Sequence, residues 1–532
     1  MGNSGDFMPT LKANLGSRVS IRLHHGEGAF RDLLGVLQSE TTLINKRGEL
    51  CKFDPADIAL LKVVPVFNRK NQRSSELAMY DTFSRKVEVI GEGRSEILMY
   101  CCGPTVYRDA HVGNLRTFLL SDLIVRALQL SGKEVRLVQN ITDVGHMSDD
   151  LQDVNHGDKL LDEAARTKVD PFAIAREYEN RFHRDLALLN VFPAEKYPRA
   201  SENMDLITSS ISQLIEKGSA YVGTDGNVYF DARRFESYGA ISGNKLENLK
   251  PGHRYEFIDE GGKGFHADWA LWKLANGRTQ MIWGSPWGAG YPGWHIECTA
   301  MSLDLLGKDI DIHVGGIDLR FPHHENERAQ SNTIASTEVV KHWVHGEHLL
   351  FEGRKMSKSA GNVVLLSDII ERGLDPLSLR LALLENRYRS QMDLTWASIE
   401  AANQTLKRWR RLINSWGESL ELKFDEEFNS AVMTDLDTPR ALQRLRAIEK
   451  DPAIGAQDKR AIFLYADEVL GLDVAREETV LELSTEQEAL LAERQQARAN
   501  KNYSESDRLR EELDAQGILV HDSPAGQSWS WK

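Results

Sequence analysis

The segment between residues 97 and 141 constrains the fold most strongly. Ile97-Leu98-Met99-Tyr100 is typical of a buried strand, a helix is predicted from about Gly113 to Leu130, and a second strand follows over 135–141. Strand, loop, helix and strand in this order form a βαβ unit. Because parallel strands are buried on both faces, the sequence predicts an α/β fold with a parallel sheet covered by helices.

The chain has 532 residues, enough for several domains. Short apolar runs separated by glycine and proline turns near the N-terminus predict a small five-stranded β-barrel, and long amphipathic helices dominate after residue 393. We expect these units: a barrel over 1–67, a linker over 68–77, the parallel-sheet unit over 78–392 with an insertion at about 195–275, a helical domain over 393–485 and a small closing domain over 486–532.

Charge and cysteine content exclude several classes of protein. The 65 basic against 79 acidic side chains leave a net charge of −14, so a nucleic acid would have to be bound by local basic clusters. Residues 1–77 carry 11 basic and 8 acidic residues, a net of +3, which leaves −17 for the rest. Four cysteines cannot form a disulfide framework, and no apolar run is long enough to span a membrane. We therefore expect a cytoplasmic protein.

Two motifs suggest contacts with phosphate. His111-Val-Gly-Asn114 lies where the first strand passes into the predicted helix, and a helix N-terminus there offers free N–H groups to an anion. Taken alone, the motif is more often an ordinary capped turn. Lys355-Met-Ser-Lys-Ser359 places two lysines around small hydroxyl residues, a cationic clamp suited to charge developing on a phosphate, or simply a solvated loop. Together the two motifs resemble the paired signatures of class I aminoacyl-tRNA synthetases.

A third group of residues suggests a metal site. His323 and Glu327 are four residues apart after Pro322, which we expect at the first helical position, so both side chains should face the same side of one helix. With Cys102 and Cys298 they provide a possible tetrahedral zinc shell. From spacing alone, two cysteines so far apart are more often buried thiols.

Longer motifs resemble one family, the cysteinyl-tRNA synthetases, from about Ala78 to the C-terminus. The motifs are Cys102-Gly-Pro-Thr-Val-Tyr107, Pro292-Gly-Trp-His-Ile-Glu-Cys298, Gly315-Gly-Ile-Asp-Leu319, Phe321-Pro-His-His-Glu-Asn-Glu327 and the lysine motif. The resemblance implies a Rossmann-like class I catalytic domain, a helical domain and a C-terminal anticodon-binding domain. It also implies one Zn²⁺ per chain, bound by Cys102, Cys298, His323 and Glu327. Cys101 is excluded because only Cys102 keeps the motif's register.

The resemblance also assigns substrates and roles. It implies that L-cysteine attacks the α-phosphate of ATP, bound with Mg²⁺, and that the cysteinyl group then passes to tRNA-Cys. An open zinc position would take the substrate thiolate, which serine cannot supply. The implied contacts are Trp294 and Cys102 in the amino-acid pocket, His111, Gly113, Asn114, Lys355 and Lys358 at the ATP phosphates, and Asp318 near the ribose. The family favours a monomer.

The sequence departs from the family pattern in two places. Asn114 stands where the first signature usually has a second histidine, so it can donate a hydrogen bond but carries no charge. The segment Val144–Asp150 differs from the Asp-Asp-Lys sequence common in the family, which puts local substrate contacts there in question.

The acceptor of the cysteinyl group is the main alternative left open. Related ligases that join cysteine to a small amine lack the far C-terminal domain, and a catalytically inactive regulatory module is a third possibility. The C-terminal tail resembles that of the synthetases, and Trp529 there is either a residue that stacks on an unpaired anticodon base or an ordinary surface or core tryptophan. Arg408 and Arg411, in a basic cluster on a long helix, are candidate phosphate contacts or part of a solvated face. The barrel carries no readable motif, and we hypothesise that it binds RNA or a partner.

Overall fold

The computed structural model describes most of the chain. The described residues are 11–12, 15, 18–25, 29–45, 50–64, 75–144, 159–249, 262–356, 362–417, 422–476, 484–500, 502–516, 518–523 and 526–531. Among them, no helix is both long and apolar enough to cross a membrane.

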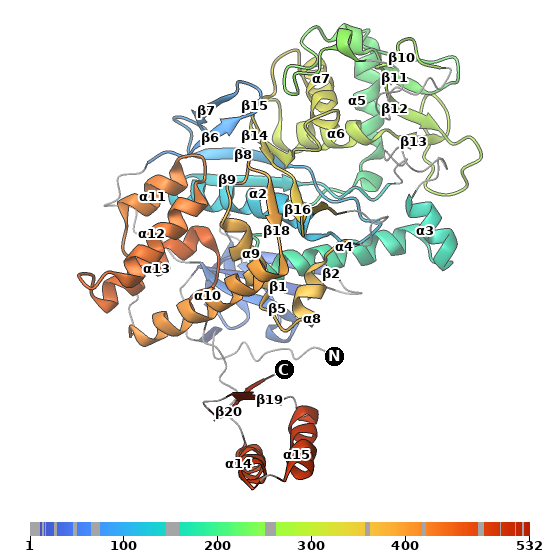
Figure 1. Ribbon diagram of the computed structural model, residues 1–532. Helices are drawn as coiled ribbons and strands as arrows, with labels where there is room; N and C mark the ends of the chain where they lie inside the picture. The colour runs from blue at the N-terminus through green and yellow to red at the C-terminus, as the bar shows by residue number, and fades with distance from the viewer. Residues whose placement is uncertain are drawn as a thin grey trace.

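A four-stranded parallel sheet forms the centre of the molecule (Figure 1). Its strands are β8 (Glu96–Cys101), β9 (Glu134–Gln139), β14 (Ile310–Gly316) and β15 (Val340–Gly346). They lie in the order β15-β14-β8-β9, and every neighbouring pair is parallel. Helix α2 (Val112–Leu130) connects β8 to β9, which confirms the predicted βαβ unit. Since the chain turns to opposite sides of β8, the β8–β14 boundary is a switch point where open parallel sheets bind ligands.

Helices cover both faces of this sheet. Met99 and Cys101 belong to the core that includes α2, whereas Tyr100 and Cys102 belong to the core that includes α6 (Trp294–Leu306). Helix α7 (His323–Ala335) joins β14 to β15, and Figure 1 shows α6 and α7 on the same side of the sheet. Pro322 is the N-cap of α7 and not its first helical residue, so that expectation was wrong by one position.

A smaller antiparallel sheet interrupts the chain between β9 and α6. Its strands, in sheet order, are β10 (Ala220–Val222), β11 (Val228–Phe230), β12 (Trp269–Leu274) and β13 (Gly290–Pro292). Helices α3 (Lys159–Thr167), α4 (Pro171–Leu188) and α5 (Met204–Glu216) precede it. The sheet extends beyond the expected end of the insertion at about residue 275, because β13 leads directly into α6.

The lysine motif follows a third sheet and precedes the helical region. The sheet contains β16 (Leu349–Phe351), β17 (Arg354–Lys355) and β18 (Met392–Leu394), and α8 (Leu366–Glu371) and α9 (Pro376–Leu384) lie between β17 and β18. The later helices are α10 (Trp396–Ser415), α11 (Glu426–Met433), α12 (Thr438–Lys450) and α13 (Ala456–Leu470). Ile399, Leu406 and Ile413 are buried along α10, as its apolar periodicity predicts.

The N-terminal region forms a five-stranded antiparallel sheet in the order β4-β3-β2-β1-β5. The strands are β1 (Arg18–His25), β2 (Ala29–Ser39), β3 (Thr42–Asn45), β4 (Leu50–Lys52) and β5 (Ile58–Val64). The edge strands β4 and β5 do not pair with each other among the described residues, so a closed barrel is not confirmed. A separate hairpin, β6 (Ala78–Asp81) and β7 (Lys86–Val89), packs beside β15.

The C-terminal region has a core of its own. Helices α14 (Thr485–Ala499) and α15 (Tyr503–Ala515) pack on the hairpin formed by β19 (Ile518–Ser523) and β20 (Gly526–Trp531). Leu491, Leu513, Ile518 and Val520 fill the space between them. In Figure 1 this unit stands at the end of the molecule, below the helical region.

Candidate metal centre and active site

His111 caps the helix that follows the first strand. Its Nδ1 accepts a hydrogen bond from the backbone N–H of Asn114 at 3.2 Å, and Asn114 Oδ1 accepts one from the His111 N–H at 3.3 Å. Burial lowers the pKa of His111 to about 4, so the ring is neutral at pH 7. Because Nδ1 is an acceptor, the ring proton lies on Nε2, which can donate to an anion near the helix N-terminus.

The lysine motif lies against this helix start. The Val112 N–H donates to the Val364 carbonyl at 2.9 Å, just beyond the motif, and a Cβ on Gly113 would lie 2.9 Å from the terminal methyl of Met356. Lys355 is exposed on β17. The two signatures therefore lie in contact, as the expectation that both bind ATP requires. Lys358 falls within 357–361, outside the described residues.

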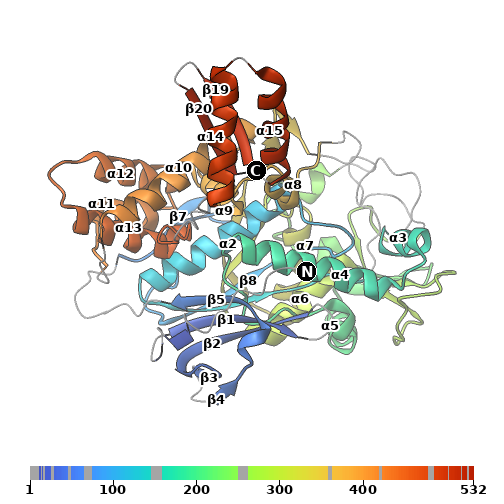
Figure 2. The ribbon, with the colours of Figure 1, turned by 90° about the horizontal axis from the view of Figure 1, so that it is seen from below.

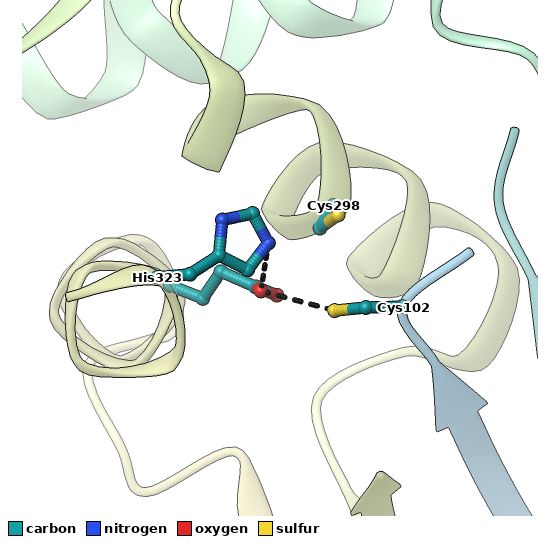
Figure 3. Close-up of side chains that lie close together, drawn as sticks. Cys102, Cys298 and His323 are labelled. Atoms are coloured by element: carbon teal, nitrogen blue, oxygen red, sulfur yellow. Dashed lines mark hydrogen bonds and ion pairs between the residues drawn. The ribbon is translucent and has the colours of Figure 1, made fainter. Parts of the chain in front are cut away.

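Four candidate metal ligands converge on the other face of the sheet. Cys102 follows β8, Cys298 lies on α6, and His323 and Glu327 lie on α7, so three separate elements supply them (Figure 3). Their ligand atoms all lie within 4.8 Å of one another, and all four residues are buried. His323 Nε2 is 2.8 Å from Glu327 Oε1, and the Cys102 thiol donates to the same oxygen at 3.4 Å.

Two further histidines reach this cluster, and the sequence reasoning missed both. His313 Nε2 and His324 Nε2 lie 3.3 and 3.4 Å from Cys102 Sγ, so a second compatible set shares Cys102 and Glu327 with the first. His324 stands beside His323 in the sequence, a signal that was available. His313 lies within β14, and only the pairing of β14 with β8 brings it near Cys102.

The protonation of the cluster fits a cation. Burial raises the pKa of the Cys102 thiol and of the Glu327 carboxyl, and burial lowers the pKa of His313 to about 4. Glu327 Oε2 is buried without a hydrogen-bond partner among the described residues. A divalent ion would favour the thiolate and carboxylate forms and would satisfy this oxygen. Two sulfurs, one imidazole and one carboxylate form a donor set suited to zinc.

The remaining predicted contacts with small substrates lie at the rim of the cluster and sheet. The Trp294 ring lies 4.3 Å from the His323 ring, at the first turn of α6. Asp318 is exposed in the loop after β14, where a Cβ on Gly316 would lie 2.3 Å from its Oδ1. Trp294 therefore borders the metal cluster, and Asp318 lies at the carboxyl end of the sheet.

The predicted RNA contacts are partly exposed. Trp529 is 39 % exposed on β20. Arg408 and Arg411 are exposed on α10, with Arg408 paired to Glu449 at 3.1 Å. The expected compact cluster is interrupted, because Arg410 turns inward and pairs with Asp375 at 2.6 Å.

Comparisons with known proteins agree with these features. The family model for the catalytic domain of tRNA synthetases class I (C) matches residues 88–404, and that for the cysteinyl-tRNA ligase anticodon binding domain matches residues 481–529. A cysteine–tRNA ligase 1 of Burkholderia lata is 41 % identical, over 85 % of this chain and 96 % of that protein. Cysteine–tRNA ligases of Thermus thermophilus and a Geobacillus species are 40 % and 36 % identical, over 85 % and 86 % of this chain and 99 % of each relative.

Among solved structures, a methionyl-tRNA synthetase of Mycobacterium tuberculosis aligns at 15 % identity with a TM-score of 0.47, over 71 % of this chain and 90 % of that one. The family match covers both the sheet that holds the candidate ligands and the closing unit that holds Trp529. With a catalytic match over more than half its length and relatives near 40 % identity, this chain belongs to the cysteinyl-tRNA synthetase family of class I ligases.

Proposed function

We propose that this synthetase activates L-cysteine with ATP to form cysteinyl-adenylate and transfers the cysteinyl group to tRNA-Cys. The convergence of Cys102, Cys298, His323 and Glu327 within 4.8 Å carries the proposal, because these residues would hold one Zn²⁺ at the floor of the amino-acid pocket. Zinc, when bound, stabilises a coordinated thiolate, and serine has no comparable group. This bond provides discrimination beyond the roughly 10–200-fold that a shape-fitting pocket gives.

The chain's own side chains would bind and orient the ATP. The neutral His111 donates from Nε2 toward phosphate oxygens, Asn114 fixes the ring by the capping bonds, and Gly113 leaves room for close approach of the nucleotide. Lys355 and Lys358 would neutralise charge on the phosphates together with the Mg²⁺ that accompanies ATP. Asp318 would hold the ribose, and Trp294 would close the amino-acid pocket beside His323.

The tRNA would contact the helical and closing units. Residues 486–532 would read the anticodon, with Trp529 stacking on a base, while Arg408 and Arg411 would contact backbone phosphates. We place the catalytic unit at 78–392 and the helical unit at 393–485, and we propose a monomeric enzyme acting in the cytoplasm. The family match at 481–529 favours tRNA over a small amine as the acceptor.

Substitution of one candidate ligand tests the zinc assignment. We expect about one zinc per wild-type chain, severe loss of zinc in Cys298→Ser, and at least a tenfold fall in the preference for cysteine over serine in ATP–pyrophosphate exchange. Cys101→Ser is the matched control, because this adjacent buried thiol faces α2. Wild-type protein without zinc, or a Cys298→Ser enzyme with normal zinc and selectivity, would contradict the assignment.

A further inference from the structure

A cavity of about 230 Å³ opens at the outer edge of the parallel sheet, between the β6–β7 hairpin and the carboxyl ends of β14 and β15. Arg85 in the hairpin turn, Arg320 after β14 and Arg389 before β18 line it, together with Thr82, His345 and Glu347. None of these residues belongs to the candidate metal set or to the two signatures. Three guanidinium groups around one small cavity make it a candidate site for an anion.

Two of these arginines have no ion-pair or hydrogen-bond partner for their side chains among the described residues. Arg389 Nε pairs with Asp435 at 2.5 Å, but the side chains of Arg85 and Arg320 form neither an ion pair nor a hydrogen bond with any described residue. Arg320 Nε is in fact buried without a partner. A buried donor left unsatisfied destabilises the fold, and an acceptor entering the cavity would relieve that cost.

Other polar side chains that line the cavity already have hydrogen-bond partners within the protein. Thr82 Oγ1 is 2.9 Å from His345 Nδ1, and Glu347 Oε1 accepts from the His348 N–H at 2.9 Å. Glu347 is the only carboxylate among the lining residues, so the two unpaired arginines leave the cavity net positive. The volume is below the roughly 300–1,000 Å³ typical of sites for whole small molecules. A single phosphate group suits both the size and the planar fork of arginine.

The loop after β14 lines the cavity and also carries Asp318, the proposed ribose contact. Arg320 follows Asp318 by two residues, and the Ile317 N–H donates to the Gly346 carbonyl at 2.8 Å, which joins the loop after β14 to the end of β15. A phosphate-bearing chain that enters the active site over this edge would therefore pass the two unpaired arginines.

We propose that this cavity is a phosphate-binding subsite in which Arg85 and Arg320 hold one phosphate group. The group comes either from the RNA backbone or from free phosphate, and the RNA source rests on the proposed function. A phosphodiester of the tRNA at this position would orient the tRNA 3′ end, which accepts the cysteinyl group, toward the carboxyl end of β14.

The test uses the full-length, zinc-loaded protein, three variants of the cavity arginines and one control variant. Inorganic phosphate is titrated by calorimetry, and KM for tRNA-Cys is measured at several salt concentrations. Arg85→Gln and Arg320→Gln remove one charge each, whereas Arg320→Lys keeps it. Lys86→Gln is the control, because Lys86 is exposed on the same hairpin and does not line the cavity. Zinc content and thermal melting confirm that each variant is folded.

Each outcome decides the proposal. For both sources we expect saturable phosphate binding that weakens about tenfold in the glutamine variants and less in Arg320→Lys. For an RNA phosphate, KM for tRNA also rises about tenfold, and the salt slope falls by about one, with a smaller change in tRNA-independent exchange. For free phosphate alone, KM for tRNA matches that of Lys86→Gln. The proposal is overturned if phosphate affinity and KM for tRNA in the glutamine variants both equal those of Lys86→Gln. Failure of the proposed function would instead appear in the wild-type protein, as absent cysteine-dependent exchange.

Discussion

Side-chain direction distinguishes the two adjacent cysteines, of which one is a candidate metal ligand and the other is not. Cys101 and Cys102 are consecutive, yet they belong to the cores on opposite faces of the sheet, because side chains alternate at a strand end. Cys102 therefore meets Glu327 and the histidines, whereas Cys101 packs in the core that includes α2. The same alternation makes one thiol a candidate ligand and the other a suitable control.

Gly113→Ala should impair ATP binding. The new Cβ would lie 2.9 Å from the Met356 methyl, which is the flexible end of that side chain, and 3.0 Å from the His111 ring, so the methyl would have to turn aside and the ring would have to give slightly. Overpacking of this kind costs about 1–3 kcal/mol, which predicts a rise of roughly tenfold or more in KM for ATP in the exchange assay. Gly455→Ala is the control, since a Cβ there meets nothing within 4 Å. Equal KM values for the two variants would show that the contact has no role in ATP binding.

Asp185→Asn should be more stable than the wild type, and the difference should grow as the pH rises. Burial raises the pKa of Asp185 on α4 to about 7, with the nearby Asp109 adding to the shift. Well below pH 4 the carboxyl is protonated in both the folded and unfolded states. Between pH 4 and 7 only the unfolded state ionises, so this group destabilises the fold progressively, by up to about 4 kcal/mol above pH 7. The melting temperatures of variant and wild type should therefore differ more at pH 8 than at pH 4.5, and a constant difference would contradict this.

Among the elements, α2 links the two halves of the candidate ATP site. Arg116 is buried on α2 and donates four hydrogen bonds to backbone carbonyls, at 2.7 and 3.0 Å to Glu347 and His348 and at 3.1 and 2.9 Å to Arg387 and Ser390. These carbonyls lie before β16 and before β18. The helix that His111 caps thus holds the sheet from which the lysine motif extends.

Arg116→Met should loosen this connection. The substitution removes all four bonds. The His348 and Arg387 carbonyls keep the backbone N–H groups of Met392 and Ser390, at 3.3 and 3.1 Å, whereas the Glu347 and Ser390 carbonyls lose their donor. We expect a loss of about 2–5 kcal/mol in the free energy of unfolding. Amide exchange should rise in β16 and β18, as measured by mass spectrometry. Arg184→Met, at an exposed position on α4, is the matched control. Unchanged exchange in β16 and β18 relative to that control would refute the role given to Arg116.

At the scale of the whole molecule, the N-terminal sheet is attached to the catalytic body through α4, and Figure 2 shows the two side by side. Arg22 on β1 is 4 % exposed and donates to the His183 carbonyl on α4 at 3.0 Å. On the same helix, Arg181 pairs with Asp109 at 3.2 Å, two residues before His111. The appended sheet is thus connected through one helix to the loop before the first signature.

Arg22→Met should weaken this attachment without unfolding the catalytic body. The substitution removes the charge-assisted hydrogen bond to the His183 carbonyl, at a cost of about 1.5–3 kcal/mol. We expect faster limited proteolysis between the N-terminal sheet and residue 78, with cysteine-dependent exchange largely kept. Lys52→Met, at an exposed position on β4, controls for the loss of charge. Cleavage at the control rate would show that Arg22 does not hold the sheet in place.

Much of the fold was predictable because its signals are local. Apolar periodicity predicted β8, α2, β9 and α10 within a few residues. The prediction of a compact basic cluster failed where distant contacts decide, because Arg410 is contiguous with Arg408 and Arg411 and yet turns inward to Asp375. The five N-terminal strands form one sheet, but closure into a barrel is not confirmed among the described residues. A run of basic residues in the sequence shows which charges are present but does not show which of them face solvent.

The sequence by itself determined the parallel α/β architecture, the two signatures and the four candidate ligands, because periodicity and motif register depend on neighbours along the chain. Only the tertiary structure decided that His313 and His324 join those ligands, that Arg116 connects α2 to the sheet before the lysine motif, and that Arg85 and Arg320 share one cavity. The physical reason is that these contacts join residues far apart in the chain, and their distances and unpaired atoms exist only once the strands have paired and the helices have packed.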